Sequence, residues 1–229
     1  HGKQSVRVCL ARLRPARPAA AESDFFDMQS EVEFRVLLAL VTLAFVAHRG
    51  YYHRKCRVFA EGATDAERGK FASSVAGALS AVGLLASIAY IVNARWLAWS
   101  AAPLPDWLRW VGLVLALAGF VLLHLAQRAL GTNWSESPRM LDGQTMVAEG
   151  PYRSIRHPIY TAFLLILAAP LLLSANWFIG SAWLAMTGLE VSSRIRVEED
   201  LMTARFGDRY RRYRAVTGAL LPRLSWRGR

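Results

Sequence analysis

Cysteine is scarce in this chain. Its 229 residues include only Cys9 and Cys56, which lie far apart and show neither a CxxC pair nor a Cys/His spacing. Structural zinc sites and disulfide frameworks need several such residues at regular spacing. The two cysteines therefore indicate isolated thiols, and we predict neither a metal site nor a disulfide.

Acidic residues are also few, and a glycine-rich phosphate loop is missing. The chain holds 17 Asp or Glu against 28 Lys or Arg, a formal net charge of +11. Such a charge suits nucleic acid, but most basic residues here flank apolar runs, as in the cytoplasmic loops of membrane proteins. We therefore predict membrane lipid, and not nucleic acid, as a partner. The lack of a strand–GxGxxG–helix unit excludes the dinucleotide-binding signature of soluble α/β enzymes.

Apolar residues, in contrast, are abundant. They make up 54% of the chain, which also contains eight Trp and has a mean hydropathy of +0.22. A helix of about 20 apolar residues is long enough to cross a bilayer. The sequence therefore predicts an all-α integral membrane protein, a bundle of about five transmembrane helices. The spans are expected at 32–52, 71–92, 107–125, 159–173 and 177–189.

The last two spans are expected to form a tight helical hairpin. The turn at 174–176 joins them, and Pro170 is expected to bend or end the first helix. From 191 onward the chain is charged, and we predict a helix that breaks near Gly207 and again at Pro222.

Residues 1–27 are expected to be a flexible basic tail. They contain five Lys or Arg but no continuous apolar core, so they do not resemble a secretory signal. One membrane domain is predicted over 28–229, with its basic loops and the C-terminal part in the cytoplasm. The basic tail then falls on the opposite side. Either the tail is not native or the first run does not span, and we favour the first explanation.

Two polar stretches border the last two spans. Residues 144–160, QTMVAEGPYRSIRHPIY, lie between apolar runs, and residues 194–199 begin where the last run ends. Ionisable groups at membrane depth usually mark a functional site. We therefore predict a pocket on the cytoplasmic side, formed by the loop before the fourth span and by the C-terminal helix.

Charged side chains follow the last span at steps of four residues. Glu190, Arg194 and Glu198 share one face of a helix, whereas Glu199 points about 100° away. This stripe is either a ladder of salt bridges at the membrane edge or part of a functional site. Glu199 is either solvated or supports that site.

Several residues of the polar loop have both a structural and a functional interpretation. His157 precedes Pro158, which favours the first position of a helix, so its ring is placed at a helix start. It is either a packing histidine or a ligand-binding one. Tyr152 and Tyr160 are either interfacial aromatic residues or the lining of a pocket.

The motifs in these stretches resemble those of one enzyme family. They are Gly150-Pro151-Tyr152, Arg156-His157-Pro158-Ile159-Tyr160, Arg194-x-x-x-Glu198-Glu199, and Phe206-Gly207-Asp208-Arg209-Tyr210-Arg211-Arg212-Tyr213 before Leu221-Pro222. Residues 130–222 are therefore similar to the isoprenylcysteine carboxyl methyltransferase family and its phospholipid methyltransferase relatives. Ala162 stands where the family usually has Gly, and its methyl group either tightens helix packing or narrows the pocket.

The resemblance implies a cofactor, S-adenosyl-L-methionine, and a role for each matched residue. It places Glu198 near the cofactor's ammonium group, and it assigns Arg194 to the carboxylate of the methyl acceptor, so these two form the expected catalytic pair. The residues expected to bind the cofactor are Ser137, Gln144, Thr145, Met146, Val147, Tyr152, His157, Pro158, Ile159, Tyr160 and Glu198.

The implied activity is methyl transfer to a lipophilic acceptor, most simply the carboxylate of a prenylated cysteine. A carboxylate is ionised at neutral pH and requires no base. A phospholipid amine or a small thiol is the alternative acceptor, and it needs a base, for which His124 and Glu190 are the candidates. A non-enzymatic membrane bundle is the third alternative.

Overall fold

The computed structural model describes residues 19–57, 67–131 and 145–223. Over these ranges the chain is helical and contains no strand, so the all-α prediction is confirmed. The elements are α1 (Ala19–Arg57), α2 (Glu67–Val92), η1 (Ala94–Ser100), α3 (Asp106–Leu130), η3 (Gly150–Arg153), α4 (Pro158–Ser174), α5 (Trp177–Phe206) and α6 (Asp208–Val216).

The beginning of α1 differs from the predicted tail. The helix starts at Ala19, so residues 19–27 are helical, whereas we expected them to be irregular. The chain divides into two units between Glu33 and Phe34. The bundle and the site described below belong entirely to the second unit, which includes α1 from Phe34 onward.

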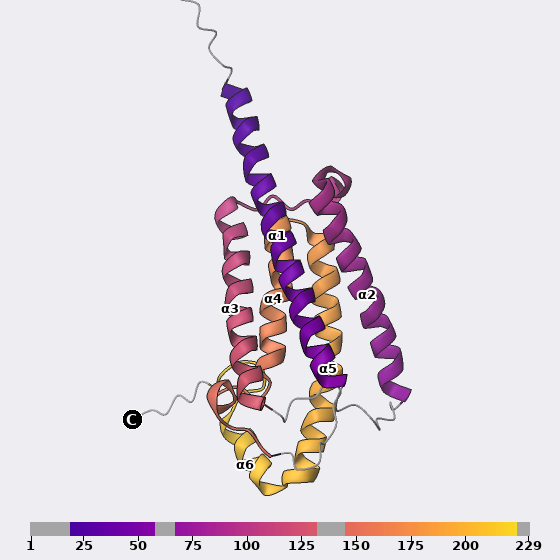
Figure 1. Ribbon diagram of the computed structural model, residues 1–229, viewed down its shortest axis with the longest axis vertical. Helices are drawn as coiled ribbons and strands as arrows, with labels where there is room; N and C mark the ends of the chain where they lie inside the picture. Colours follow the sequence, from indigo (N-terminus) through magenta and orange to yellow (C-terminus); the bar gives the residue numbers. More distant parts are fainter. Residues whose placement is uncertain (1–18, 58–66, 132–144, 224–229) are drawn as a thin grey trace, which may run out of the picture. The chain divides into compact units, whose positions relative to one another are not determined.

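In this unit α2, α3, α4 and α5 stand side by side (Figure 1). α3 packs against α4, α4 against α5, and α5 against α2. Glycines let α3 and α4 approach closely. A Cβ atom built on Gly112 would lie 2.8 Å from Leu172 Cβ, and one on Gly119 would lie 2.6 Å from Ile166 Cγ1. Small residues permit this kind of packing between apolar helices.

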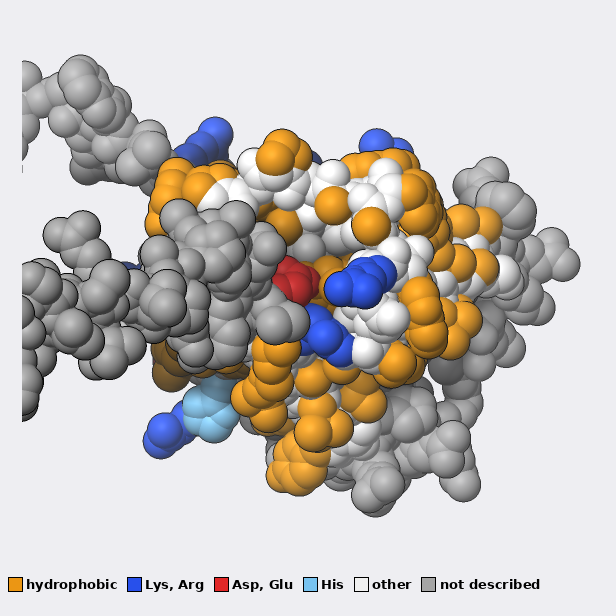
Figure 2. Space-filling view, turned by 90° about the horizontal axis from the view of Figure 1, so that it is seen from above, with side chains coloured by type: hydrophobic (Ala, Val, Ile, Leu, Met, Phe, Trp, Pro, Cys, Tyr) orange, Lys and Arg blue, Asp and Glu red, His pale blue; other side chains and the backbone are white. Residues whose placement is uncertain are grey.

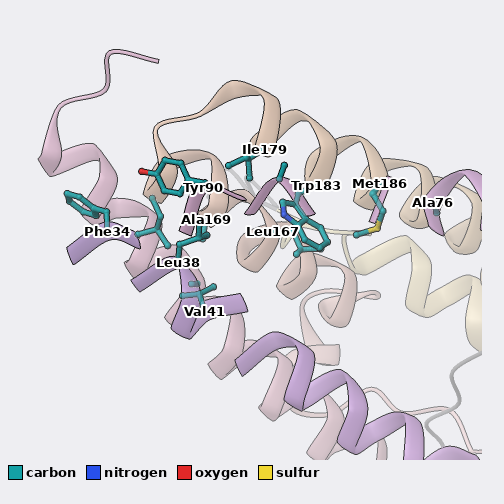
Figure 3. Packing of buried hydrophobic residues seen from close by; sticks show 13 residues of the cluster. Phe34, Leu38, Val41, Ala76, Tyr90, Leu167, Ala169, Ile179, Trp183 and Met186 are labelled. Atoms are coloured by element: carbon teal, nitrogen blue, oxygen red, sulfur yellow. The ribbon is translucent and has the colours of Figure 1, made fainter. Parts of the chain in front are cut away.

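Apolar side chains from α1, α2, α3, α4 and α5 fill the centre of the unit. Phe34, Leu38 and Val41 lie on one side of α1 and point toward the core (Figure 3). Trp183 of α5 packs against α2, where its indole Nε1 donates to Ser87 Oγ at 3.2 Å. The buried indole N–H is therefore satisfied, as such groups generally are.

The turn between α4 and α5 lies where the sequence predicts it and is anchored by Asn176. This side chain is 2% exposed, and its Oδ1 caps α5 by accepting from the backbone N–H of Ile179 at 3.1 Å. Its Nδ2 donates to the Leu97 carbonyl of η1 at 3.0 Å. Pro170 lies inside α4 and does not end it, because the helix continues to Ser174.

Arg109 of α3 is buried at the same end of the bundle. Its Nε and Nη2 donate to the Leu173 carbonyl at 3.1 and 2.9 Å, and Nη2 also donates to the Tyr90 hydroxyl at 3.0 Å. The guanidinium lies 3.9 Å from the ring centroid of Phe34. The last carbonyls of a helix carry partial negative charge, so α4 offers this cation a favourable partner.

The outer surface of the bundle is strongly apolar. Leu43 of α1, Leu85 of α2 and Val114 of α3 are each more than 60% exposed. Figure 2 shows hydrophobic side chains over much of the described face seen from above, with few charged ones among them. By length and composition, Ser74–Val92 and Asp106–Leu130 are able to cross a membrane, and Pro158–Ser174 is a shorter apolar helix.

Beyond its apolar part, α5 continues as a charged helix. It ends at Phe206, and Gly207 has φ +52°, the left-handed region that favours glycine. α6 follows at once, and the chain then returns toward the start of α4 (Figure 1). The predicted break at Gly207 is confirmed.

The contact between α3 and α4 generates a stability prediction. We expect Gly119→Ala to destabilise the bundle by about 1–3 kcal/mol, because the added methyl group also falls 2.9 Å from the Ala162 carbonyl oxygen. Gly77→Ala in α2 is the matched control, since its Cβ would meet nothing within 4 Å. Thermal unfolding in detergent measures both variants. Equal unfolding temperatures would contradict the close packing of α3 on α4.

Candidate functional site

The site is built at the first turn of α4. His157 precedes the helix with φ −124°, and Pro158 occupies its first turn, as the His-Pro sequence predicts. The His157 side chain is buried, and its ring stacks on Tyr160 with centroids 5.7 Å apart. A buried imidazole needs polar partners, and α5 supplies them.

Glu198 of α5 reaches both of these α4 side chains. The Tyr160 hydroxyl donates to Glu198 Oε1. The other oxygen, Oε2, lies 3.4 Å from His157 Nδ1. The Glu198 side chain nevertheless remains 30% exposed. Its carboxylate is therefore oriented by two neighbours and still accessible to a cationic ligand.

Glu199 is a buried carboxylate that three basic side chains contact. Arg156 Nε donates to its Oε1 at 2.9 Å, and Arg214 Nε of α6 lies 3.3 Å from its Oε2. His157 Nε2 lies 3.4 Å from Oε1. Of the two roles considered for Glu199, solvation is thus wrong, because the residue is 7% exposed. It supports the site from within.

The cations around Glu199 decide its ionisation. Burial alone would raise the pKa of this carboxyl. The opposing effects are larger and lower the pKa: they come from the hydrogen bond and charge of Arg156, the charge of Arg214 and the hydrogen bond to His157. Burial raises the pKa of Tyr152, and the nearby charge of Glu198 raises it further. Glu199 is therefore ionised and Tyr152 neutral at pH 7.

The C-terminal segment closes one side of the site. The backbone N–H groups of Arg156 and His157 donate to the carbonyls of Gly218 and Ala219 at 2.8 and 3.0 Å. Thr161 Oγ1 donates to the Leu220 carbonyl at 2.6 Å. A Cβ atom on Gly218 would lie 1.7 Å from the Leu221 carbonyl oxygen, so this tight segment requires glycine.

Arg194 lies one turn before Glu198 on α5, with its Nη2 4.0 Å from Glu190 Oε1. It also interacts with the hydroxyl of Tyr160. The Arg194 and Glu190 side chains are 28% and 32% exposed. Of the predicted stripe, the structure thus shows the Arg194–Glu190 contact, while Glu198 turns toward α4.

The other predicted cofactor-binding residues belong to the segment before α4 or lie outside the described residues. Thr145 is exposed, while Met146 and Val147 are half-buried in the irregular segment that leads to η3. Gly150 follows with φ +55°. Tyr152 is buried, and its carbonyl accepts from the Tyr213 hydroxyl at 2.6 Å. Ser137 and Gln144 lie outside the described residues.

Sequence reasoning gave no role to three residues that hold the site together. Arg156 and Tyr213 stand within the quoted motifs, and Arg214 directly follows one. Arg156 donates to Glu199 and to the carbonyls of Arg214 and Thr217, so it joins α5 to the C-terminal segment. A basic residue beside a buried histidine was the available signal, but its partners lie far along the chain.

The lowered pKa of Glu199 generates a pH prediction. A carboxyl whose pKa falls on folding stabilises the native state above its unfolded pKa, and this contribution is lost as pH drops through the folded value. We expect wild type to lose thermal stability on acidification below about pH 4.5, and Glu199→Gln to be less stable at pH 7 with a flatter profile. Asp208→Asn is the control, because this carboxylate is exposed and contacts only Arg211 in the described part of the chain. Parallel profiles of wild type and Glu199→Gln would contradict the network.

Comparisons with known proteins agree with the motifs. The model of the Isoprenylcysteine carboxyl methyltransferase (ICMT) family matches residues 110–204. This range contains the start of α4 and both glutamates of the site. No curated protein matches the chain.

Among solved structures, the chain is similar to that of the eukaryotic intramembrane Ras methyltransferase ICMT determined without a monobody. The two are 19% identical, and the superposition has a TM-score of 0.49. It covers 69% of this chain and 54% of the other, so the chain spans about half the length of that protein. The resemblance predicted from the motifs is confirmed by the family model: residues 110–204 match the ICMT family.

Proposed function

We propose that this chain is an integral membrane methyltransferase that uses S-adenosyl-L-methionine and methylates the carboxylate of a prenylated cysteine or a similar lipophilic acid. The proposal rests on where Glu198 and Arg194 lie. The residues matched by the family model include the partly exposed Glu198 and Arg194, which meet the first turn of α4 beside a strongly apolar bundle. We further propose that the bundle crosses the membrane about five times and that the site faces the cytoplasm.

The side chains around Glu198 fit the cofactor. S-adenosyl-L-methionine supplies a methyl group on a sulfonium and carries an ammonium and a carboxylate. Glu198 is partly exposed and oriented by Tyr160 and His157, so it suits the ammonium group. Met146 and Val147, half-buried before η3, offer apolar contact to the adenosine. These roles support the proposed set of cofactor-binding residues, with His157, Pro158, Ile159 and Tyr160 around the helix start.

Arg194 suits the carboxylate of the acceptor. Its guanidinium is 28% exposed and lies near Tyr160, one helical turn from Glu198. A planar guanidinium binds a carboxylate at two points and so fixes its direction as well as its position. Glu190 Oε1 lies 4.0 Å from Nη2 of this guanidinium. Acceptor and cofactor would then be held by residues of one helix face.

Positioning is most of the chemistry that the protein must perform. The acceptor carboxylate attacks the methyl carbon while the bond from that carbon to sulfur breaks, and no proton is transferred. Glu198 and Arg194 contribute by holding the two reactants in line, which removes the entropic cost of their encounter. Tyr152 is neutral at pH 7 like an ordinary tyrosine, and burial raises its pKa further, so it adds no competing charge.

A phospholipid amine or a small thiol is the second acceptor class, and a specific contact bears on it. Such an acceptor must lose a proton, so a base within reach would be needed. Glu190 is partly exposed beside Arg194, whereas His124 is exposed on α3. Glu190 is therefore the better candidate of the two. Screening acceptors with a radiolabelled methyl donor distinguishes these classes, and a structural bundle would bind no cofactor at all.

Substitutions of Arg194 and of Glu198 are expected to have different effects. Glu198→Gln should weaken cofactor binding ten-fold or more, because a charge-assisted contact contributes roughly 1.5–3 kcal/mol. Arg194→Gln should bind the cofactor nearly normally but methylate slowly, and Arg194→Lys should restore the rate only in part. Cofactor dissociation constants and single-turnover methylation rates of the variants distinguish a loss of binding from a loss of rate.

Two exposed neighbours on α5 serve as matched controls. Asp200→Asn and Arg196→Gln remove the same charges two residues away, where the side chains face solvent. Neither should change cofactor binding or rate by more than about two-fold. The assignment is wrong if Glu198→Gln and Arg194→Gln lose cofactor affinity alike, or if neither loses activity.

A further inference from the structure

The segment that follows α6 exposes two apolar side chains that pack neither in the bundle nor in the site. Val216, the last residue of α6, is 73% exposed, and Leu221 is 72% exposed. The backbone turns tightly between them. Arg223 Nη1 then donates to a backbone carbonyl of α6, which holds the end of the segment against that helix. Residues 216–223 therefore form one compact turn, here called the C-terminal turn, with two apolar side chains on its outside.

Hydrogen bonds hold the C-terminal turn at the level where the apolar part of α4 begins. The carbonyls of residues 218–220 accept from two backbone N–H groups before α4 and from Thr161 Oγ1. Pro158–Ser174 is an apolar helix, so its first turn marks one edge of the apolar bundle. The two exposed apolar side chains are therefore presented near the boundary between the apolar bundle and the charged end of α5.

Arginines without an ion-pair partner in the described part of the chain lie on the same side of α6. Arg209 and Arg212 are exposed, and with Val216 they fall within about 60° around the helix axis. The buried Tyr210 points roughly 120° away from Val216. Asp208 is the only acidic residue of α6, and it pairs with a different arginine. This α6 stripe thus presents uncompensated positive charge beside the C-terminal turn.

We infer that the C-terminal turn and the α6 stripe bind the anionic headgroups of the cytoplasmic leaflet, with Val216 and Leu221 inserted beneath the headgroups. The inference rests on the part of the proposed function that places this end of a membrane-crossing bundle in the cytoplasm. The stripe rises about 10 Å from Arg209 to Val216, and a headgroup layer is about 5–8 Å thick. Arginine side chains on the stripe can therefore reach lipid phosphates while the apolar pair reaches the acyl chains.

Lipid fits this surface better than a soluble acidic partner does. An acidic peptide would also satisfy the arginines of the α6 stripe. The C-terminal turn, however, lies at the edge of the apolar bundle surface, beside the lipid that a membrane-crossing bundle meets there. Insertion into that lipid removes both exposed apolar side chains from water without a further protein.

Quenching of a fluorophore by brominated lipid tests the inference. A bimane label is attached to Leu221→Cys, with Cys9 and Cys56 replaced by serine, and the full chain is placed in vesicles of equal phosphatidylglycerol and phosphatidylcholine. Bromine is carried on the acyl chains of one lipid at a time. Bromine on phosphatidylglycerol should quench more strongly, corresponding to roughly five-fold or greater enrichment of this lipid, the usual effect of one arginine at an anionic surface.

Variants of exposed arginines show whether charge causes the enrichment. Arg209→Gln combined with Arg212→Gln should reduce it below about two-fold. This double variant should unfold at the wild-type temperature, because exposed arginines without a partner contribute little to stability. Arg95→Gln is the matched control: it removes an exposed charge from η1, which lies beside the α4–α5 turn at the other end of α4, and should leave the enrichment intact.

A second label position separates failure of this inference from failure of the proposed function. A label on Leu85→Cys, exposed on the apolar face of α2, should be quenched by both lipids alike. If only this label is quenched, the C-terminal turn lies in water, as a surface for a soluble acidic partner would, and the inference is overturned although the bundle contacts lipid. Equal quenching of the Leu221→Cys label by both lipids, or enrichment that survives in the double variant, also overturns it. If neither label is quenched, the membrane-crossing part of the proposed function fails, and the inference fails with it.

Discussion

The buried carboxylate of Glu199 is the constraint on which the site depends. Removing an ionised carboxylate from water costs several kcal/mol unless cations and hydrogen-bond donors replace the solvent. Arg156, before α4, and Arg214, in α6, supply them, one at each carboxylate oxygen. Arg156 also donates to the carbonyls of Arg214 and Thr217. The compensation of one charge therefore brings α4, α5 and the C-terminal segment together.

An arginine side chain binds at each end of α4. At its beginning, Arg156 joins the helix start to α5 through Glu199. At its end, Arg109 donates to the Leu173 carbonyl and contacts Tyr90 of α2. Apolar packing between these ends has little direction, because the hydrophobic effect favours buried area and no particular geometry. The directional contacts at the two ends therefore fix where α4 lies, and with it His157 and Tyr160.

The helix boundaries could be predicted from local turn residues, whereas contacts between residues far apart in the sequence could not. The hairpin at 174–176, the helix start at Pro158 and the break at Gly207 follow from turn residues between apolar or charged runs, and all three are confirmed. The helical angle correctly separated Glu199 from Glu198, but the partner of Glu199 lies 43 residues earlier. No pattern within one helix indicates such a pair. Pro170 was expected to bend or end α4; it does not end the helix, which continues past it to Ser174.

Glu198 and Glu199 have different neighbours because a helix turns by about 100° per residue. That rotation points Glu199 inward to two arginines and leaves Glu198 at the rim, 30% exposed and still held by Tyr160 and His157. His157 contacts both carboxylates, one with each ring nitrogen, so it couples the buried network to the exposed acid. If the helix were rotated by one residue, Glu198, proposed to bind the ligand, would be buried, and Glu199, which holds the surrounding segments together, would be exposed. The order of the two roles along α5 is thus set by helix geometry.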